Sequence, residues 1–148
     1  MSLPQYNAAT EVEVRSVYFT GSDKLKEGYA LCFDQDASLT DADPRLRLGG
    51  AVEKPATANL NAFAGVVAPD SDGVTGPGFV SIIVPRKGQI SKALVKADAT
   101  AFTTLLKPVD ASYALGADGD GFGADTVAKA AQTADTSGTA AVKAVQFV

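Results

Sequence analysis

The sequence contains no histidine and no tryptophan, and its only cysteine is Cys32. Histidine is the commonest general base and the commonest metal ligand, so its absence removes both from this chain. Neither a Ser-His-Asp triad nor a Cys-His pair is possible. A lone cysteine forms no intrachain disulfide, and Cys32 lies in the apolar run 29–33, where we expect a small buried side chain. We therefore expect no enzymatic activity, no cofactor and no metal site.

Basic residues are fewer than acidic ones: 13 Lys and Arg stand against 17 Asp and Glu, which gives a net charge of −4. Binding to a phosphate backbone requires clustered Lys and Arg side chains. The only adjacent basic pair is Arg86-Lys87. We therefore expect no direct contact with nucleic acid.

Long hydrophobic runs are also missing. No stretch approaches the roughly 18 apolar residues that a membrane helix needs. The first residues lack the basic and then apolar pattern of a secretory signal. We expect a chain that is made in the cytoplasm and has no membrane partner.

What the sequence does contain is a series of short segments rich in Val, Ile and Ala, separated by Gly, Pro and Asp. Such segments are typical of strands. A length of 148 residues favours one domain, and we find neither a repeat of fixed period nor a dividing linker. The pattern predicts a mostly β, single-domain sandwich or barrel-like fold with long loops and at most short helices. We expect an extended N-terminal arm at residues 1–10 and the β-rich domain at residues 11–148.

The strongest β signal runs from Asn61 to Val95. It contains the apolar runs Phe63–Val67 and Phe79–Val84, and the second run is followed by Pro85-Arg86-Lys87-Gly88 and then by Gln89–Val95. We interpret this last part as a hairpin with a basic tip. We expect further strands at 11–18, 29–33, 51–53, 105–108, 111–115 and 139–148, one helical turn at 56–61, and either a short helix or a loop at 124–133.

Acidic residues cluster in two loops. Asp118-Gly119-Asp120-Gly121 is similar to the start of an EF-hand calcium loop, but Lys129 stands where that loop needs a bidentate Glu. We interpret this segment as a solvated turn, with a nonstandard cation site as the alternative. The Asp residues of the loop 34–50 are interpreted as surface groups that remain ionised.

Two sequence phrases carry a resemblance to a known family. They are VEKPATANLNAFAGVVAP at 52–69 and GFVSIIVPRKGQISKALV at 78–95. With the N-terminal arm and the small-residue strands, they resemble the small capsid decoration, or cement, proteins of tailed bacteriophages. In that family an F-x-G-V-V strand precedes a Gly-rich loop and a strand-turn-strand unit. Phe63–Val67 and Gly88–Val95 stand in these places, and the resemblance covers roughly residues 50–105.

The resemblance implies a structural virion protein on the outer capsid surface, often a homotrimer, that binds the major capsid protein and stabilises the head. The alternative is a non-catalytic β-sandwich binding module of a phage tail or surface, with a carbohydrate or protein ligand. That alternative is poorly served by a chain without Trp and with only four Tyr.

Partner contacts are expected from three places. The N-terminal arm is either a disordered tail or a segment that orders against a partner. The basic tip is either a solvated turn or an electrostatic contact to an acidic neighbouring subunit. With the loop 34–50, these places supply the candidate residues Leu3, Pro4, Tyr6, Arg45, Arg47, Arg86 and Lys87.

Overall fold

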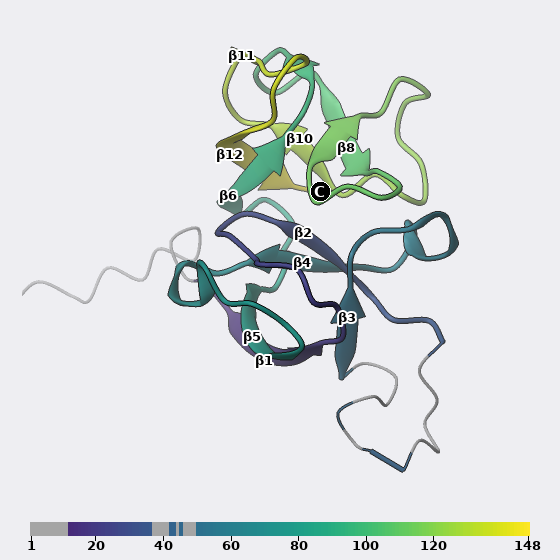
Figure 1. Ribbon diagram of the computed structural model, residues 1–148. Coiled ribbons are helices and arrows are strands. Elements are labelled where there is room, and N and C mark those ends of the chain that lie inside the picture. The colour runs from purple at the N-terminus through teal and green to yellow at the C-terminus, as the bar shows by residue number, and fades with distance from the viewer. Residues whose placement is uncertain (1–11, 37–41, 44, 46–49) are drawn as a thin grey trace, which may run out of the picture.

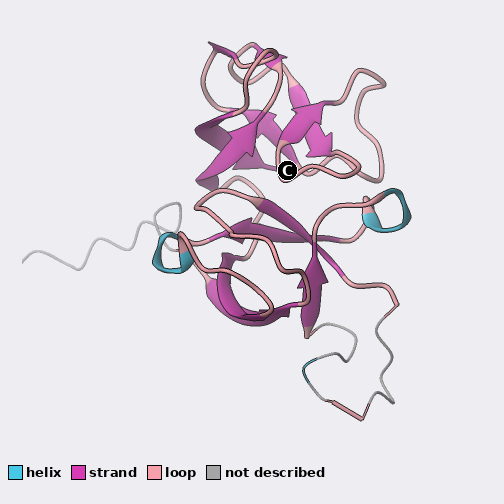
Figure 2. Ribbon diagram, in the orientation of Figure 1, coloured by secondary structure: helices cyan, strands magenta, loops and turns pink. Residues whose placement is uncertain are grey.

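The computed structural model describes residues 12–36, 42–43, 45 and 50–148. The arm predicted at residues 1–10 and the loop residue Arg47 lie outside the described residues. Strands dominate the described part, and the helices there include only short 3-10 turns such as η2 (Thr57–Asn59) and η3 (Pro69–Ser71) (Figure 2). The prediction of a mostly β, barrel-like fold with at most short helices is confirmed.

The first sheet closes into a barrel with the strand order β1-β3-β2-β4-β5, in which β5 returns to β1. β1 runs parallel to β3, and the other pairings are antiparallel. Because side chains alternate along a strand, β1 turns Val17 and Phe19 inward, where both are buried. The strands of this first barrel are β1 (Val14–Phe19), β2 (Ala30–Phe33), β3 (Ala51–Glu53), β4 (Phe63–Val67) and β5 (Gly78–Ile83).

The second sheet closes into another barrel, which lies above the first in Figure 1. Its strand order is β10-β12-β6-β9-β8, and β8 returns to β10. A small two-stranded sheet of β7 (Asp98–Ala99) and β11 (Ala134–Asp135) joins two of its loops. The strands of this second barrel are β6 (Ile90–Val95), β8 (Leu105–Pro108), β9 (Leu115–Ala117), β10 (Ala128–Ala130) and β12 (Ala141–Phe147).

The two barrels have the same topology. In each, the first strand pairs in parallel with the third and antiparallel with the fifth, while the second strand joins the third and fourth, and the fourth joins the fifth. The register agrees as well. Phe19 of β1 lies opposite Val52 of β3, and Val95 of β6 lies opposite Leu115 of β9. One consistent set of equivalent residues relates all the pairings of the first barrel to those of the second, so the chain is a tandem structural repeat.

Hydrogen bonds at the strand ends repeat in the same way. Thr20 N donates to Val52 O at 3.1 Å, and the equivalent Lys96 N donates to Leu115 O at 2.9 Å. Such agreement outside the regular ladders supports the equivalence of the two barrels. Three more hydrogen bonds have an equivalent in the other barrel, and all six are 2.9 Å long. In the first barrel they are Val67 N to Tyr29 O, Ala68 N to Ser81 O and Val84 N to Glu13 O. Their equivalents in the second barrel, in the same order, are Ala130 N to Thr104 O, Ala131 N to Ala144 O and Phe147 N to Gln89 O.

Most equivalent inward positions are apolar in both barrels, with Val80 and its equivalent Lys143 as an exception, and the side chains differ. The sequence has no repeat of fixed period, as expected, and the repeat is present in the fold alone: the second and third strands are separated by residues 34–50 in the first barrel and by residues 109–114 in the second. The equivalent buried pairs are Val17/Ala93, Phe19/Val95, Leu31/Leu106, Val52/Leu115, Val67/Ala130 and Ile82/Val145, of which one pair alone is identical.

One hydrophobic cluster is shared by the two barrels. Ala30, Val66 and Ile83 face away from the interior of the first barrel, yet they are buried because they pack with the core residues of the second. Phe63 extends this contact, with its ring centroid 6.2 Å from that of Phe147. The junction is thus a packed apolar surface rather than a tether.

Backbone atoms also cross the junction. Leu94 N donates to Gly28 O at 2.8 Å, whereas the equivalent amide of the first barrel, Tyr18 N, donates to Gly50 O inside its own barrel at 2.8 Å. The segment 28–30 of the first barrel therefore lies next to β6 of the second barrel. In the first barrel, Gly50 fills the equivalent place next to β1. This exchange accounts for the shorter β6–β9 pairing.

Tyr113 completes the junction. Its ring stacks on Tyr29 with a centroid separation of 4.9 Å, and its hydroxyl donates to Asp23 at 2.6 Å. Its carbonyl oxygen accepts a hydrogen bond from Ala30 N at 2.9 Å. Burial, followed by the hydrogen bond to Asp23, raises the pKa of Tyr113. A residue of the second barrel is thus held by three groups of the first.

The hairpin predicted between Phe79 and Val95 is wrong. β5 pairs with β1 and β4, and β6 pairs with β12 and β9, so residues 84–89 link the two barrels. Both strands are interior members of closed sheets, where each edge already has a partner. A short turn permits a hairpin, but closure of two barrels satisfies more backbone groups.

Two further expectations need correction. Residues 124–133 contain a strand, β10, instead of a helix or loop only, and the strand expected at 111–115 lies at β9. Ala-rich segments have low strand propensity, which tertiary packing overrides. The strands expected at 51–53 and 105–108 and the turn expected at 56–61 are confirmed.

Candidate interaction surfaces

Among the described residues, no group of three or more His, Cys, Asp or Glu side chains is placed to hold a metal ion. None of the described helices is long and apolar enough to span a bilayer. The features that stand out are exposed apolar side chains and a few cations beside them.

An outward apolar pair occurs at the same place on both barrels. Tyr18 and Phe79 lie opposite each other on β1 and β5, with their ring centroids 5.4 Å apart in an edge arrangement. The equivalent pair on β6 and β12 is Leu94 and Val142. Phe79 is 59% exposed and Val142 is 44% exposed. Each barrel thus presents a comparable apolar contact to its surroundings.

The exposure of apolar residues is repeated at the start of the first strand of each barrel. Val14 on β1 and Ile90 on β6 are equivalent, and both stay about half exposed (51% and 52%). Large apolar residues exposed singly are ordinary on protein surfaces. Their recurrence at equivalent positions of two otherwise divergent barrels is what favours a binding role.

Arg45 joins the apolar pair of the first barrel. Its guanidinium carbon lies 5.0 Å from the centre of the Tyr18 ring, and it forms an ion pair with Asp43 at 2.5 Å. Hydrogen bonds from Arg45 lower the pKa of Asp43 to about 2. Exposed ion pairs add little to stability, so we assign this pair no part in holding the fold together.

Arg86 and Lys87 lie elsewhere. Arg86 forms an ion pair with Glu13, at the opposite end of β1 from Tyr18. Lys87 is exposed and borders a hollow on the second barrel. The predicted residues Arg45 and Arg86 therefore do not form one site, and Leu3, Pro4, Tyr6 and Arg47 lie outside the described residues.

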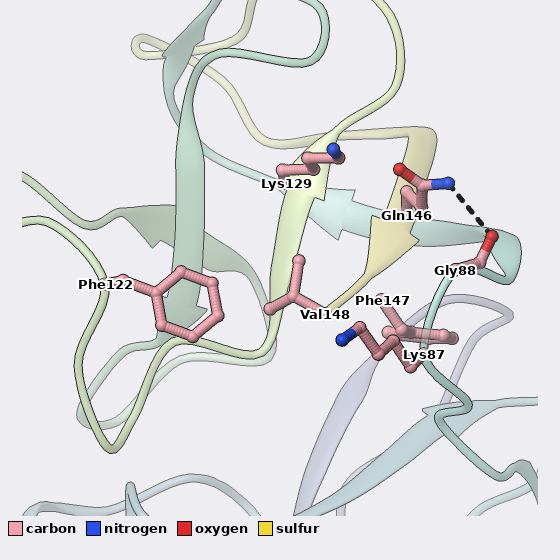
Figure 3. A pocket seen from close by; sticks show the side chains of 7 residues that line it. All are labelled: Lys87, Gly88, Phe122, Lys129, Gln146, Phe147 and Val148. Carbon is pink, nitrogen blue, oxygen red and sulfur yellow. Dashed lines mark hydrogen bonds between the residues drawn. The ribbon is translucent and has the colours of Figure 1, made fainter.

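The hollow has a volume of about 450 Å³. Phe122, which is 71% exposed, stands at one side of it, and Lys87 with Phe147 stands at the other (Figure 3). Gln146 Nε2 donates to Gly88 O at 3.0 Å and closes one part of the wall. The lining consists of Lys87, Gly88, Phe122, Lys129, Gln146, Phe147 and Val148.

The turn expected at 118–121 is solvated at Gly119, Asp120 and Gly121, but Asp118 at its start is buried. The Thr126 hydroxyl donates to one carboxylate oxygen, while Asp120 N donates to the other at 3.3 Å and Lys107 Nζ lies 3.8 Å from it. The hydrogen bond from Thr126 is the main reason that the pKa of Asp118 is lowered. Protein groups engage both oxygens, so Asp118 holds the loop together.

Sequence reasoning missed Phe79, Phe122 and Lys129 as surface residues. Phe79 begins an apolar run, and strand alternation alone does not say which face of such a run is inward. Phe122 is an aromatic residue among Gly and Asp residues, so its neighbours in the sequence offer no apolar side chains that would bury its ring. That contrast was the one available signal.

No protein-family model matches the sequence, and no curated protein is significantly similar to it. Functional inference therefore rests on the two barrels and on the surfaces that they present.

Proposed function

We propose that this protein is a structural virion protein that decorates the outer surface of a tailed-phage head and stabilises it by binding the major capsid protein. The observation that carries the proposal is the repeated outward apolar pair, Tyr18–Phe79 and Leu94–Val142. Exposed apolar residues that recur in one chain suit a surface assembled from repeated subunits.

Two contacts per chain bring an energetic advantage. When the first apolar pair is bound, the second is held at high effective concentration near its own site, so two weak contacts act as a stronger one. Assembly into the homotrimer that we expect would multiply the contacts again by symmetry. A net charge of −4 is compatible with a position outside the packaged DNA.

The test is binding to assembled heads of the major capsid protein encoded in the same genome. Phe79→Asp combined with Val142→Asp should reduce the chain that sediments with heads by about tenfold or more, because charged groups replace apolar contact residues. Ser22→Asp combined with Thr139→Asp adds the same charge at other exposed positions and should leave binding unchanged. Unreduced binding of the first variant would refute the role of the apolar pairs, and wild-type chain that never sediments with heads would refute the function.

The arm requires its own experiment. Deletion of residues 1–10 should abolish binding to heads while the circular dichroism spectrum stays unchanged, because β1 begins only at Val14. Normal binding by the shortened chain would exclude the arm as the contact segment.

The oligomeric state is measured separately. Light scattering of the full-length protein as it elutes from a size-exclusion column should give the mass of a trimer.

A further inference from the structure

The hollow lies on the face of the second barrel that corresponds to the junction face of the first. On the first barrel, Val66 and Ile83 pair across β4 and β5 and are buried under the second barrel. The equivalent pair across β10 and β12 is Lys129 and Gln146, and both line the hollow. The same barrel face is thus covered by protein in one repeat and open in the other.

The open face is chemically changed. A Lys and a Gln replace a Val and an Ile, so a third barrel would bury a charge if it docked as the second docks on the first. The apolar part of the face is retained by Phe122, Phe147 and Val148. A partner that fits must offer an apolar group and compensate positive charge.

The charged side chains that line the hollow are both cationic. Lys87 and Lys129 line the hollow, and no carboxylate side chain is among the lining residues. Lys129 Nζ lies 5.7 Å from the centre of the Phe102 ring, a cation–π contact. In Figure 3 the amine of Lys87 points to the space between Phe122 and Val148. In a chain of net charge −4, this is a local site for a negative group.

We propose that the hollow binds a protein segment in which an apolar side chain lies between two acidic residues. The apolar side chain packs between Phe122 and Val148, and the carboxylates meet Lys87 and Lys129. The volume of about 450 Å³ accommodates a short peptide segment and not a domain. The inference rests on the proposed function only for the source of the segment, a capsid protein, since its chemistry follows from the hollow itself.

The experiment uses the full chain and three blocked tetrapeptides as probes, followed by NMR of the backbone amides. Acetyl-Asp-Leu-Phe-Asp-amide should shift the amides of Gly88, Phe122 and Gln146 and bind at least about tenfold more tightly than acetyl-Lys-Leu-Phe-Lys-amide, since two ion pairs are replaced by two repulsions. Acetyl-Asp-Ser-Ser-Asp-amide should also bind more weakly, because it lacks the apolar group. Inorganic phosphate, added at the same total negative charge as the acidic peptide, tests whether a simple anion binds equally well.

Variants give the second measurement. Lys87→Glu combined with Lys129→Glu should lower affinity for the acidic peptide by about tenfold. Lys24→Glu combined with Lys26→Glu makes the same charge change at exposed positions away from the hollow and should not alter it. Phe122→Ser should weaken the peptide with Leu-Phe and leave the Ser-Ser peptide unaffected.

Equal binding of the acidic and basic peptides, equal effects of the two lysine pairs, or phosphate that shifts the same amides as strongly as the acidic peptide would overturn the proposal. These readouts need no heads, so they stand apart from the proposed function. Peptide binding without head binding supports the site and refutes decoration, whereas head binding without peptide binding does the reverse.

Discussion

Gly28 is a residue at which the backbones of the two barrels are in direct contact. Its φ is +87°, and an added Cβ would lie 3.2 Å from Leu94 N, the atom that donates to Gly28 O. Both the left-handed backbone and the close approach favour glycine. We expect Gly28→Ala to lower the free energy of unfolding by about 2–3 kcal/mol, measured by urea denaturation.

Gly88→Ala is the matched control for this prediction. Gly88 has a φ of +85°, but nothing lies within 4 Å of an added Cβ. Only backbone strain should appear there, at about 1 kcal/mol. Equal losses at the two positions would show that the close approach at Gly28 has no energetic weight.

Cys32 is the second residue with a measurable signature. It is fully buried on β2, as the sequence predicted, and burial followed by the charge of Glu53 raises its pKa to about 12. An unfolded thiol titrates near 8.5. The folded chain therefore keeps the thiol proton up to a higher pH than the unfolded chain does. The resulting contribution to the free energy of unfolding is complete below pH 8.5 and falls as the pH rises toward 12.

The thiol should not react with a disulfide reagent at pH 8 in the native chain and should react fully in denaturant. Between pH 8 and pH 10, wild type should lose more unfolding free energy than Cys32→Ala, which lacks the group. Rapid labelling of the native chain would contradict the burial of Cys32.

At the scale of elements, reciprocal substitutions at equivalent positions of the two barrels should have very different effects on the free energy of unfolding. Val66 on β4 is buried in the shared cluster, while Lys129 on β10 is half-buried beside the hollow. Val66→Lys places an unpaired charge in the cluster and should cost about 3 kcal/mol or more. Lys129→Val should change the unfolding free energy by less than about 0.5 kcal/mol.

Thermal and urea unfolding of both variants provide the measurement. A similar loss for the two exchanges would mean that the second barrel does not cover Val66. The comparison thereby tests the junction without removing any strand.

At the scale of the whole molecule, the shared cluster should make the chain unfold as one unit. Ala30, Val66 and Ile83 would be exposed if the second barrel opened alone, so the intermediate state is disfavoured. Calorimetry should give one transition with equal calorimetric and van't Hoff enthalpies. Two resolved transitions, or a stable fold of residues 12–84 in isolation, would show that the barrels are independent.

Much of the local structure was predictable. Short runs such as Ala51–Glu53 and Leu105–Pro108 are bounded by turn residues, and the turn at Thr57–Asn59 follows Pro55. Composition also led to the burial of Cys32 and to the β-rich fold class. These features depend on neighbouring residues, which the sequence displays directly.

The repeat, its junction and the candidate surfaces were decided by tertiary structure. Equivalent core positions need only be apolar and of compatible total volume, so Phe19 and Val95 fill the same place without sequence identity. Strand partners lie far apart in the chain, and no local pattern says whether β5 turns back on β6 or closes a barrel with β1. The sequence by itself determined that this chain forms short strands without histidine chemistry. Only the closure of two barrels decided that Phe79 faces outward, that Val66 is buried and that Lys129, its equivalent, lines an open hollow.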